Sequence, residues 1–324
     1  MPLRHWRAHA PTESVPDPIP SRRRHERPLK RPGFSMPGRL FIPAHSQGSR
    51  ALVWERMRLR ICTWNVNSVR LRAEQAARFV AEQAPDVLCM QEIKCREGEF
   101  PREAFAQMGL PHLKIAGQKG WHGVAIASRL PFTDAPQLDV CREGHARSVG
   151  VSVEGVEIHN FYIPAGGDVA DREVNPKFDH KLDFFEKLTR ELAKRSPKAP
   201  LAIVGDLNVA PGENDVWNHR YMSKIVSHTP LEIAAMADLQ KSLGFIDLTR
   251  EAFPEPQKLA SWWSYRAQDF RASNRGLRLD HILVTPGLRD AAFRSGAAAA
   301  RIHDDVREWE RPSDHAPVSA DLGL

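Results

Sequence analysis

The chain has 324 residues, of which 42% are hydrophobic and 27% charged, and its formal net charge is +6. This composition is typical of a globular protein with a sizeable core, and the length allows one large domain or two ordinary ones. No apolar run approaches the roughly 20 residues that cross a bilayer, which excludes membrane spanning. The cysteines Cys62, Cys89, Cys95 and Cys141 are too few for a disulfide scaffold and show no zinc-ligand spacing, which favours a reducing compartment.

The positive charge is concentrated in residues 1–56. This segment holds eleven Lys and Arg, four Asp and Glu, and nine of the 25 prolines. From Met57 onward the chain has 35 basic and 36 acidic residues, a net charge of −1. A segment so polar and so rich in proline cannot bury enough apolar surface to offset its ordering entropy. We therefore predict a disordered basic extension over 1–56.

Other interpretations of residues 1–56 stay open. The arginines are compatible with a transit peptide, although the prolines would break its amphipathic helix. Met36 and Met57 are alternative translation starts, in which case part of the extension is not made. The segment could also be a basic arm that holds nucleic acid without sequence preference. Runs of charged residues are more often solvated tails than binding sites. This favours the interpretations in which residues 1–56 do not bind nucleic acid.

Residues 57–324 are predicted to form one domain of mixed strands and helices. Short apolar runs indicate strands at 59–64, 87–90, 124–127, 149–153, 156–163, 201–204, 279–284 and 316–322. Apolar residues recur at helical spacing over 72–84, 178–192 and 233–243. Pro85 and Gly244 are expected to end the first and last of these helices. Strands and helices without strict alternation predict an α/β domain of stacked sheets flanked by helices.

Polar side chains gather where these apolar runs begin or end. The clusters are TWNVN (63–67), MQEIK (90–94), NFYIP (160–164), GDLN (205–208), RLDH (278–281) and PSDHAP (312–317). A single short polar residue beside a strand is more often a turn former than a functional group. Six clusters that carry Asn, Asp, Glu and His are harder to explain as turns alone, and they predict a shared site.

The residue types in these clusters favour a hard cation. Carboxylate and amide oxygens without thiolates suit Mg²⁺ or Mn²⁺ and suit zinc poorly, and Glu92 is the leading ligand. His315, with a carboxylate neighbour, can hold a fixed tautomer and either donate to a phosphate oxygen or act as a base. Asp206 and Asn208 are two residues apart and are expected on one strand face, where one orients a water and the other stabilises developing charge.

Several strings in these clusters resemble one family. TWNVNSVR (63–70), QEIK (91–94), GDLNVAP (205–211), NRGLRLDHIL (274–283) and PSDHAPV (312–318) resemble the exonuclease III family of apurinic/apyrimidinic endonucleases, in the endonuclease/exonuclease/phosphatase superfamily. The resemblance covers essentially all of 57–324 and none of 1–56. It implies a four-layer α/β sandwich, with two packed mixed β-sheets flanked by helices and the site at one edge of both sheets.

The resemblance also implies a metal site that binds Mg²⁺, for which Mn²⁺ is expected to substitute. Glu92 would be the main ligand. The other residues expected at the metal are Asn65, Asp206, Asn208, Asp314 and His315. The number of metal ions stays open. Asn67 stands where some relatives carry Asp, so its role is open as well.

Catalytic roles follow from the same resemblance. Asp206 would activate or position the attacking water, and Asn208 would support the transition state. His315, held by Asp280, would contact the scissile phosphate. Tyr162, in a Y-x-P motif, would donate to a phosphate oxygen. Which group is the general base stays open.

Residues 261–280 point to the substrate. Aromatic residues alternate here with arginines: Trp262, Trp263, Tyr265 and Phe270 with Arg266, Arg271, Arg275 and Arg278. This pattern fits base stacking combined with phosphate contacts, but it fits equally well a set of core aromatics with a solvated arginine rim. The resemblance favours the first reading. It implies an apolar pocket of Trp262, Leu277 and Leu279 that admits a flipped-out sugar without its base.

The expected reaction is Mg²⁺-dependent hydrolysis 5′ to abasic sites in duplex DNA, with 3′–5′ exonuclease and 3′-phosphatase activities at the same phosphate site. The expected partner is duplex DNA with abasic sites or 3′ ends, bound by a monomer in the cytoplasm at the nucleoid. His281 departs from the family pattern and is expected to pack rather than catalyse. A superfamily phosphatase for small phosphoesters and a noncatalytic DNA-binding module are the alternatives. The second would require the loss of a site residue, and none is missing.

Overall fold

The computed structural model describes residues 58–266 and 269–324. The predicted extension over 1–56 therefore lies outside the described residues. Within the described ranges, none of the helices has the length and apolar character needed to cross a membrane.

The first sheet has six strands in the order β11-β12-β1-β2-β4-β3. They are β1 (Arg58–Asn65), β2 (Val87–Gln91), β3 (His112–Ala116), β4 (Val124–Ser128), β11 (Ala299–Ile302) and β12 (Val318–Gly323). β1 and β2 run parallel, and each is antiparallel to its other neighbour, β12 or β4. The carboxyl ends of the parallel pair therefore lie beside the amino ends of β12 and β4.

The second sheet repeats this pattern in the order β5-β6-β7-β8-β10-β9. Its strands are β5 (Thr133–Asp134), β6 (Ser148–Val153), β7 (Val156–Tyr162), β8 (Leu201–Asp206), β9 (Ile246–Asp247) and β10 (Asp280–Val284). β7 and β8 are the parallel pair. β10 is antiparallel to β8 and sets Asp280 directly opposite Asp206.

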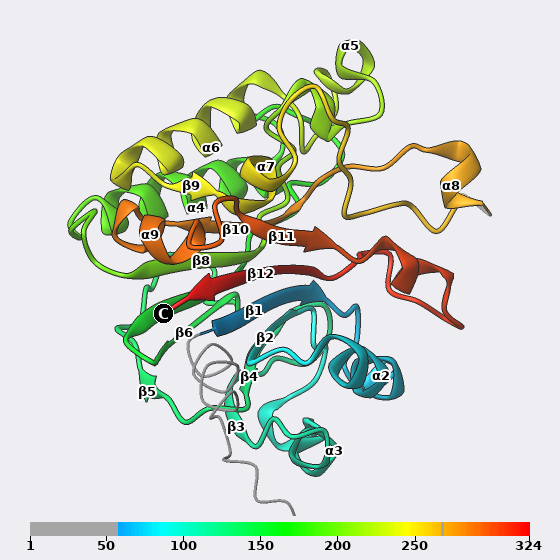
Figure 1. The fold of residues 1–324 in the computed structure, drawn as a ribbon. Helices are drawn as coiled ribbons and strands as arrows, with labels where there is room; N and C mark the ends of the chain where they lie inside the picture. Colours follow the sequence, from blue (N-terminus) through cyan, green and yellow to red (C-terminus); the bar gives the residue numbers. More distant parts are fainter. Residues whose placement is uncertain (1–57, 267–268) are drawn as a thin grey trace, which may run out of the picture. The chain divides into compact units, whose positions relative to one another are not determined.

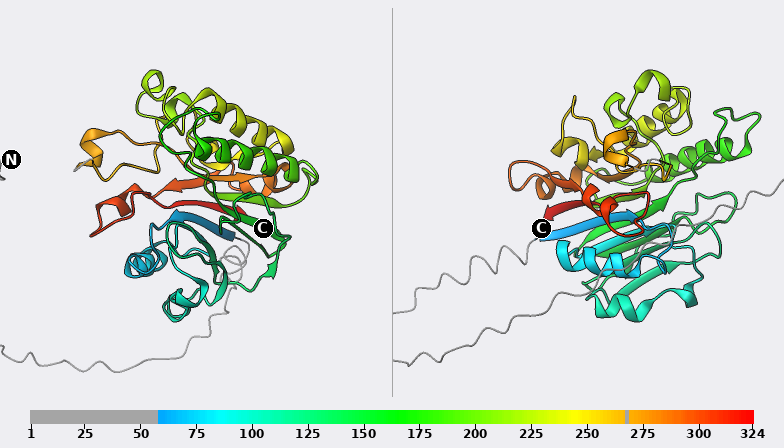
Figure 2. Two further views of the ribbon diagram at one scale, coloured as in Figure 1. Left: turned by 180° about the vertical axis from the view of Figure 1, so that it is seen from behind. Right: turned by 90° about the vertical axis from the view of Figure 1, so that its right-hand side faces the viewer.

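The two sheets pack face to face and helices cover both outer faces (Figure 1). α2 (Ala73–Gln83) and α3 (Arg102–Gln107) bury Phe79 and Phe105 against the first sheet. α4 (Pro176–Leu192) and α6 (Pro230–Leu243) pack on the second sheet, as two further views also show (Figure 2). The expected four-layer α/β sandwich is confirmed.

Local sequence signals explain where the long helices begin and end. Thr229 and Glu232 form a capping box at the start of α6, and Gly244 ends that helix with a left-handed φ of 67°. Ala84, also left-handed, ends α2 just before Pro85. The predicted helices over 72–84, 178–192 and 233–243 therefore correspond to α2, α4 and α6.

The shorter elements connect these layers. The short helices are α5 (His219–Met222), α7 (Leu248–Ala252), α8 (Phe270–Ser273) and α9 (Arg289–Ala292). Single 3₁₀ turns occur at Glu97–Glu99, Glu213–Asp215, Pro286–Leu288 and Asp304–Glu308. The apolar-run pattern did not predict β3, β5, β9 or β11. Each lies at or next to a sheet edge with much of its surface exposed, so its side chains need not be apolar.

Candidate active site

The polar clusters meet where the two parallel strand pairs end. Asn65 closes β1 and Glu92 follows β2, while Tyr162 closes β7 and Asp206 closes β8. Glu92 has a left-handed φ of 49°, an unusual conformation for a residue other than glycine. A strained backbone conformation persists only where the surrounding structure holds it in place. Such conformations are often found at functional sites.

The amide of Asn65 joins two carboxylates that come from different sheets. Its Nδ2 donates to Glu92 Oε1 at 3.0 Å and to Asp206 Oδ2 at 2.9 Å. The backbone N–H of Asn67 donates to Asn65 Oδ1 at 3.1 Å, which fixes this orientation of the amide. Glu92 also accepts from the hydroxyl of Tyr162 at 2.8 Å, and its other oxygen lies 2.8 Å from Lys94 Nζ. Glu92 is thus held from both sheets.

His315 is held by a chain of buried hydrogen bonds. Its Nδ1 lies 2.9 Å from Asp280 Oδ2, which also accepts from Ser261 Oγ at 2.7 Å. Ser261 Oγ in turn accepts the backbone N–H groups of Leu279 and Asp280, both at 3.0 Å. The second ring nitrogen of His315, Nε2, faces Asp206 Oδ2 at 3.7 Å. One nitrogen is therefore anchored while the other faces the carboxylate at the end of β8.

The burial and the neighbouring charges shift the pKa values of the ionisable side chains in the site. Burial alone would lower the pKa of His315, but Asp280 and Asp206 outweigh it and raise the pKa to about 10. Burial raises the pKa of Asp206 to about 7; Asp280 and Glu92 add to the rise, and His315 opposes it. Burial, with Glu92 next, also raises the pKa of Tyr162 well above its ordinary value. At neutral pH His315 and Tyr162 are therefore both hydrogen-bond donors.

The donor set fits a hard divalent cation. Glu92, Asp206 and Asp280 bring three carboxylates to one site, and ligand atoms of Asp206, Asp280 and His315 lie within 4.8 Å of one another. Among the residues described, Asp280 Oδ1 is buried without a hydrogen-bond partner. Excess negative charge on oxygen donors in a largely enclosed site is what Mg²⁺ or Mn²⁺ would neutralise.

The predicted ligands differ in how they are placed. Glu92 and Asp206 present oxygens to the same space, whereas Asn65 presents its NH₂ group and would have to turn its amide over to ligate. Asp314 accepts from Asn67 Nδ2 at 2.9 Å and from Trp262 Nε1 at 3.0 Å. A protonated His315 has no free lone pair for a metal, so its geometry suits a proton donor better than a ligand.

Asn208 does not share a strand face with Asp206, and that prediction was wrong. β8 ends at Asp206, and Asn208 has a left-handed φ of 55° in the turn that follows. Its backbone N–H donates to Asp206 Oδ1 at 3.0 Å, and its Nδ2 donates to the carbonyl of Ile163 at 2.9 Å. The Asx turn still holds the backbone of Asn208 against the Asp206 carboxylate.

The three predicted pocket residues lie together beside His315. Leu277 and Leu279 are buried in an apolar cluster against which Trp262 packs. Trp262 pairs through its backbone with Leu277 on one side and His315 on the other. The apolar cluster therefore adjoins His315.

The aromatic and arginine segment divides into two parts. Arg278 is 1% exposed and forms ion pairs with Asp215 and Asp247, both at 2.7 Å, and Trp263 is also buried. These two belong to the core, and the prediction that they face DNA was wrong. Arg266, Arg271 and Arg275 are exposed, as is Tyr265, so the remaining part of the segment is open to a polyanion.

His281 belongs to the same buried network, as expected for a packing residue. Its Nε2 lies 2.8 Å from the carbonyl of Val209, and its Nδ1 lies 3.0 Å from Arg278. Asn67, whose role was open, links Asp314 to Lys94, which donates to Asn67 Oδ1 at 2.6 Å.

Several supporting residues were not predicted. Ser261 stands directly before Trp262 in the string SWW, and that position beside a pocket residue was the available signal. Gln91 donates to Thr63 at 2.9 Å and to Asn160 at 2.6 Å, which joins the two sheets behind Glu92. The polar clusters at strand ends placed Thr63, Gln91 and Asn160 at a shared site, but their spacing along the chain does not show these individual contacts.

Comparison with known proteins places this site in a family. The model of the endonuclease/exonuclease/phosphatase family matches residues 62–315, which include every site residue named above. The chain belongs to this family. The expected resemblance to the exonuclease III branch is also confirmed, and with it the class of enzyme, a phosphoester hydrolase.

Relatives and solved structures agree with this assignment. The exodeoxyribonuclease III of Haemophilus influenzae is 31% identical over 82% of this chain and all of its own length. The DNA repair nuclease APEX1 of Danio rerio is 26% identical over 82% of this chain and 83% of its own length. An AP endonuclease structure from Archaeoglobus fulgidus and that of the Neisseria 3′ phosphatase NExo bound to product DNA hairpin each superpose with a TM-score of 0.75. They are 30% and 33% identical, and each alignment covers 82% of this chain and 100% of the other.

Proposed function

We propose that this protein is a DNA-repair nuclease that hydrolyses the phosphodiester 5′ to an abasic site in duplex DNA. The water oxygen forms a bond to phosphorus, the bond from phosphorus to the upstream O3′ breaks, and a 3′-hydroxyl is left. The observation that carries the proposal is the contact between the anchored His315 and the apolar cluster of Trp262, Leu277 and Leu279. It sets a phosphate donor beside apolar side chains against which a sugar would pack.

The side chains have distinct roles in this reaction. Protonated His315, held by Asp280, donates from Nε2 to a nonbridging phosphate oxygen. Asp206 orients the attacking water and accepts its proton. Tyr162 donates to a second phosphate oxygen once its contact to Glu92 opens, and Asn208 supports the transition state from the turn after β8.

Glu92 and Asp206 would hold Mg²⁺, for which Mn²⁺ substitutes, with Asn65, Asn208, Asp314 and His315 around them. When bound, the ion would polarise the phosphate and offset the carboxylate charge. The same phosphate site would serve 3′–5′ exonuclease and 3′-phosphatase activities. The names of the Neisseria relatives, a 3′ phosphatase and a 3′-5′ exonuclease, support this part of the proposal. We also propose that the enzyme works on duplex DNA as a monomer.

One gel tests the proposal. The full chain is incubated with an abasic oligonucleotide duplex and an intact duplex, first with EDTA and then with Mg²⁺ restored. We expect nicking of the abasic duplex only with Mg²⁺. Glu92→Ala and His315→Ala should each lower the rate by about 10²–10³-fold or more, since removing one such group costs at least that much in comparable sites.

The control variant is Asp321→Asn, at the far end of β12 in an ion pair with Arg60. It should nick at the wild-type rate. Full nicking by either site variant would overturn the assignment. Turnover of an inositol phosphate without nicking would instead support a small-molecule phosphatase, and tight binding without turnover would support a noncatalytic module.

A further inference from the structure

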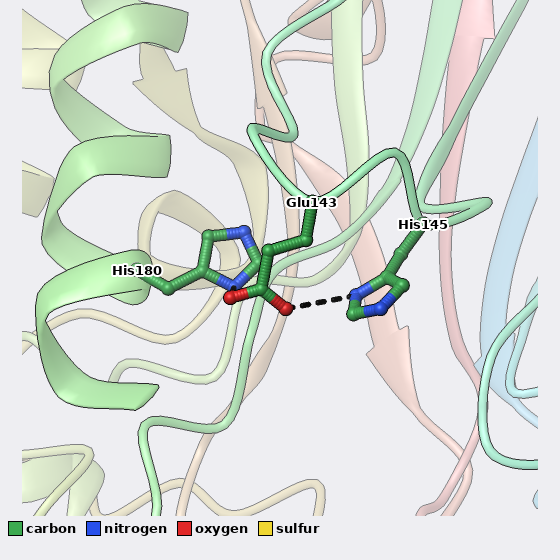
Figure 3. Close-up of side chains that lie close together, drawn as sticks. All are labelled: Glu143, His145 and His180. Atoms are coloured by element: carbon green, nitrogen blue, oxygen red, sulfur yellow. Dashed lines mark ion pairs between the residues drawn. The ribbon is translucent and has the colours of Figure 1, made fainter. Parts of the chain in front are cut away.

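Two histidines and a glutamate form a second cluster outside the active site (Figure 3). Glu143 and His145 lie on the loop before β6, and His180 lies on α4. Glu143 Oε1 is 3.3 Å from His180 Nδ1, and Glu143 Oε2 is 3.6 Å from His145 Nδ1. The ligand atoms of all three lie within 4.8 Å of one another.

These separations match the edges of a tetrahedral metal site. Zinc binds histidine nitrogen and carboxylate oxygen at about 2.0–2.2 Å, which puts two ligand atoms of a tetrahedron roughly 3.4 Å apart. The separation of 3.3 Å involves Oε1 of Glu143 and that of 3.6 Å involves Oε2, so the two values bracket this edge length without sharing one oxygen. The 3.6 Å separation is also too long for a hydrogen bond.

The ring nitrogens are available for a metal. His145 Nδ1 is buried, and it makes no hydrogen bond to any part of the chain that the structure describes. The other nitrogen of His180, Nε2, lies 3.4 Å from Cys141 Sγ. A proton on Nε2 shared with this sulfur leaves the Nδ1 lone pair facing Glu143, the arrangement that outer partners impose on metal-binding histidines.

We propose that Glu143, His145 and His180 form a binding site for a zinc-class divalent cation, distinct from the active site. Two imidazoles and one carboxylate are the ligand set of a borderline ion, whereas the active site offers mainly oxygens. The side chain of Glu143 is 45% exposed, so the fourth position is open to water. Spacing along the sequence did not reveal the site because its ligands come from a loop and from a helix more than 30 residues away.

The site is one that would stabilise structure near the catalytic groups. An ion here ties the loop before β6 to α4. His145 stacks on His122 with ring centroids 4.3 Å apart, and His122 lies 6.3 Å from Tyr162. The carbonyl of His122 accepts the backbone N–H of Lys94 at 3.0 Å, two residues after Glu92. The cluster is thus next to, but does not include, the residues that hold Glu92.

Calorimetry in the presence of Mg²⁺ tests the proposal. The full chain is stripped with a chelator, returned to excess Mg²⁺ to saturate the active site, and titrated with ZnCl₂. We expect one zinc ion per chain. His145→Asn and His180→Asn should each weaken its binding by at least about tenfold, because even the loss of an outer partner of a metal ligand costs about that much. Co²⁺ added in place of Zn²⁺ should give a tetrahedral visible spectrum in the wild type and not in these two variants.

Two controls make the result specific. Glu92→Gln, which alters the active site, should bind zinc like the wild type. His219→Asn removes a member of another histidine pair, His219 and His228, and should also leave zinc binding unchanged. Absence of zinc binding under excess Mg²⁺ would overturn the proposal, and so would equal affinities in the wild type and His145→Asn. Because His145 is only partly buried, that variant is expected to fold, and nicking activity checks it.

Discussion

At the scale of single residues, the site depends on one charge placed behind His315. Asp280 is 0% exposed, and its oxygen holds His315 Nδ1 and accepts from Ser261. The carboxylate both orients the ring and keeps it protonated, because a nearby negative charge favours the charged form. A neutral group of the same shape would still orient the ring, but it would not keep the ring protonated.

Asp280→Asn separates these two effects. We expect the nicking rate at pH 8 to fall by about 10²-fold, a loss similar to that of one transition-state hydrogen bond. The pKa of His315 should drop from about 10 toward its ordinary value, so activity should be lost on the alkaline side at a lower pH than in the wild type. Rates measured from pH 6 to pH 10 show the shift. An unchanged alkaline limb would mean that His315 need not be protonated.

Ser261 supports the same carboxylate and was not predicted. Ser261→Ala would leave the buried Asp280 carboxylate without one of its two donors and two backbone N–H groups without their acceptor. Leaving buried polar groups unsatisfied costs about 1–3 kcal/mol each, so we expect a loss of stability of about 2–5 kcal/mol together with slower nicking. Urea unfolding measures the first and the abasic duplex assay the second. Ser242→Ala, on a partly exposed helical hydroxyl, is the matched control.

His303 predicts how stability depends on pH. It is 2% exposed, and burial, with help from Arg301 and Arg60, lowers its pKa to about 4 from an ordinary 6.5. Since the folded state binds this proton less readily than the unfolded state, the stabilisation is complete above about pH 6.5 and is lost as the pH falls toward 4. The shift corresponds to at most about 3 kcal/mol. Thermal unfolding of the wild type and His303→Gln across this range should show a smaller pH dependence in the variant, and parallel curves would contradict the prediction.

At the scale of the elements, the helices on the second sheet also hold the site. Lys181 on α4 and Glu232 on α6 are both fully buried and lie 2.5 Å apart. Lys181 Nζ also donates to the carbonyl of Asn208 at 2.7 Å, in the turn after β8. Glu232 accepts the backbone N–H groups of Ser227 and Thr229. The ion pair therefore joins two helices to the turn that carries a candidate catalytic residue.

Lys181→Met should destabilise the fold by about 3–5 kcal/mol, because it leaves a buried carboxylate without its counter-charge. The double variant Lys181→Met/Glu232→Gln keeps the acceptor for the two N–H groups and removes the charge, so it should recover part of this loss. Urea unfolding of the three chains tests the coupling. Equal losses in the single and double variants would show that the charge itself is not responsible.

The long elements were predictable because their residues repeat a simple pattern. α4 and α6 bury one apolar side, and the central strands are apolar on both faces, so periodicity and run length identify them. β3 and β11 are not central, and β5 and β9 have two residues each. Whether such a segment pairs as a strand depends on the neighbour that tertiary structure supplies.

The same distinction applies to the site. The polar residues beside the predicted strands indicated Glu92, Asp206 and His315 as site residues, and the structure brings these three together. The prediction that Asn208 shares a strand face with Asp206 was wrong because the backbone takes a left-handed conformation after β8. The two-residue spacing in the sequence does not show that turn. Arg278 was interpreted as a phosphate contact, but it is buried between two aspartates. A charge pattern along the chain does not reveal partners 31 and 63 residues away.

At the scale of the whole molecule, net charge is a poor guide to DNA binding. The positive excess lies in residues 1–56, while the rest of the chain sums to −1. We expect binding to rest on local groups such as the exposed Arg266 and Arg275, with a bound metal ion offsetting the carboxylates, because Arg271 is already paired with Asp304 and Glu308.

A chain that begins at Met57 tests this view. We expect it to nick abasic duplex at the full-length rate and with the same dependence of binding on salt, because every residue of the site follows Met57. Filter binding over a range of KCl concentrations gives the slope. A clearly flatter slope for the shortened chain would show that the extension contacts phosphates, since the slope counts the phosphate contacts made.

The pairing of β1 with β12 has a consequence for synthesis. Thr63, near the start of the described chain, lies opposite Val318, and Trp64 donates to the carbonyl of His315. β12 follows β1 by about 250 residues, so this edge of β1 stays unpaired until nearly all of the described chain has been synthesised. The nascent chain can therefore complete neither the first sheet nor the surroundings of His315 before β12 emerges, and a product truncated before β12 is expected to be both inactive and prone to aggregate.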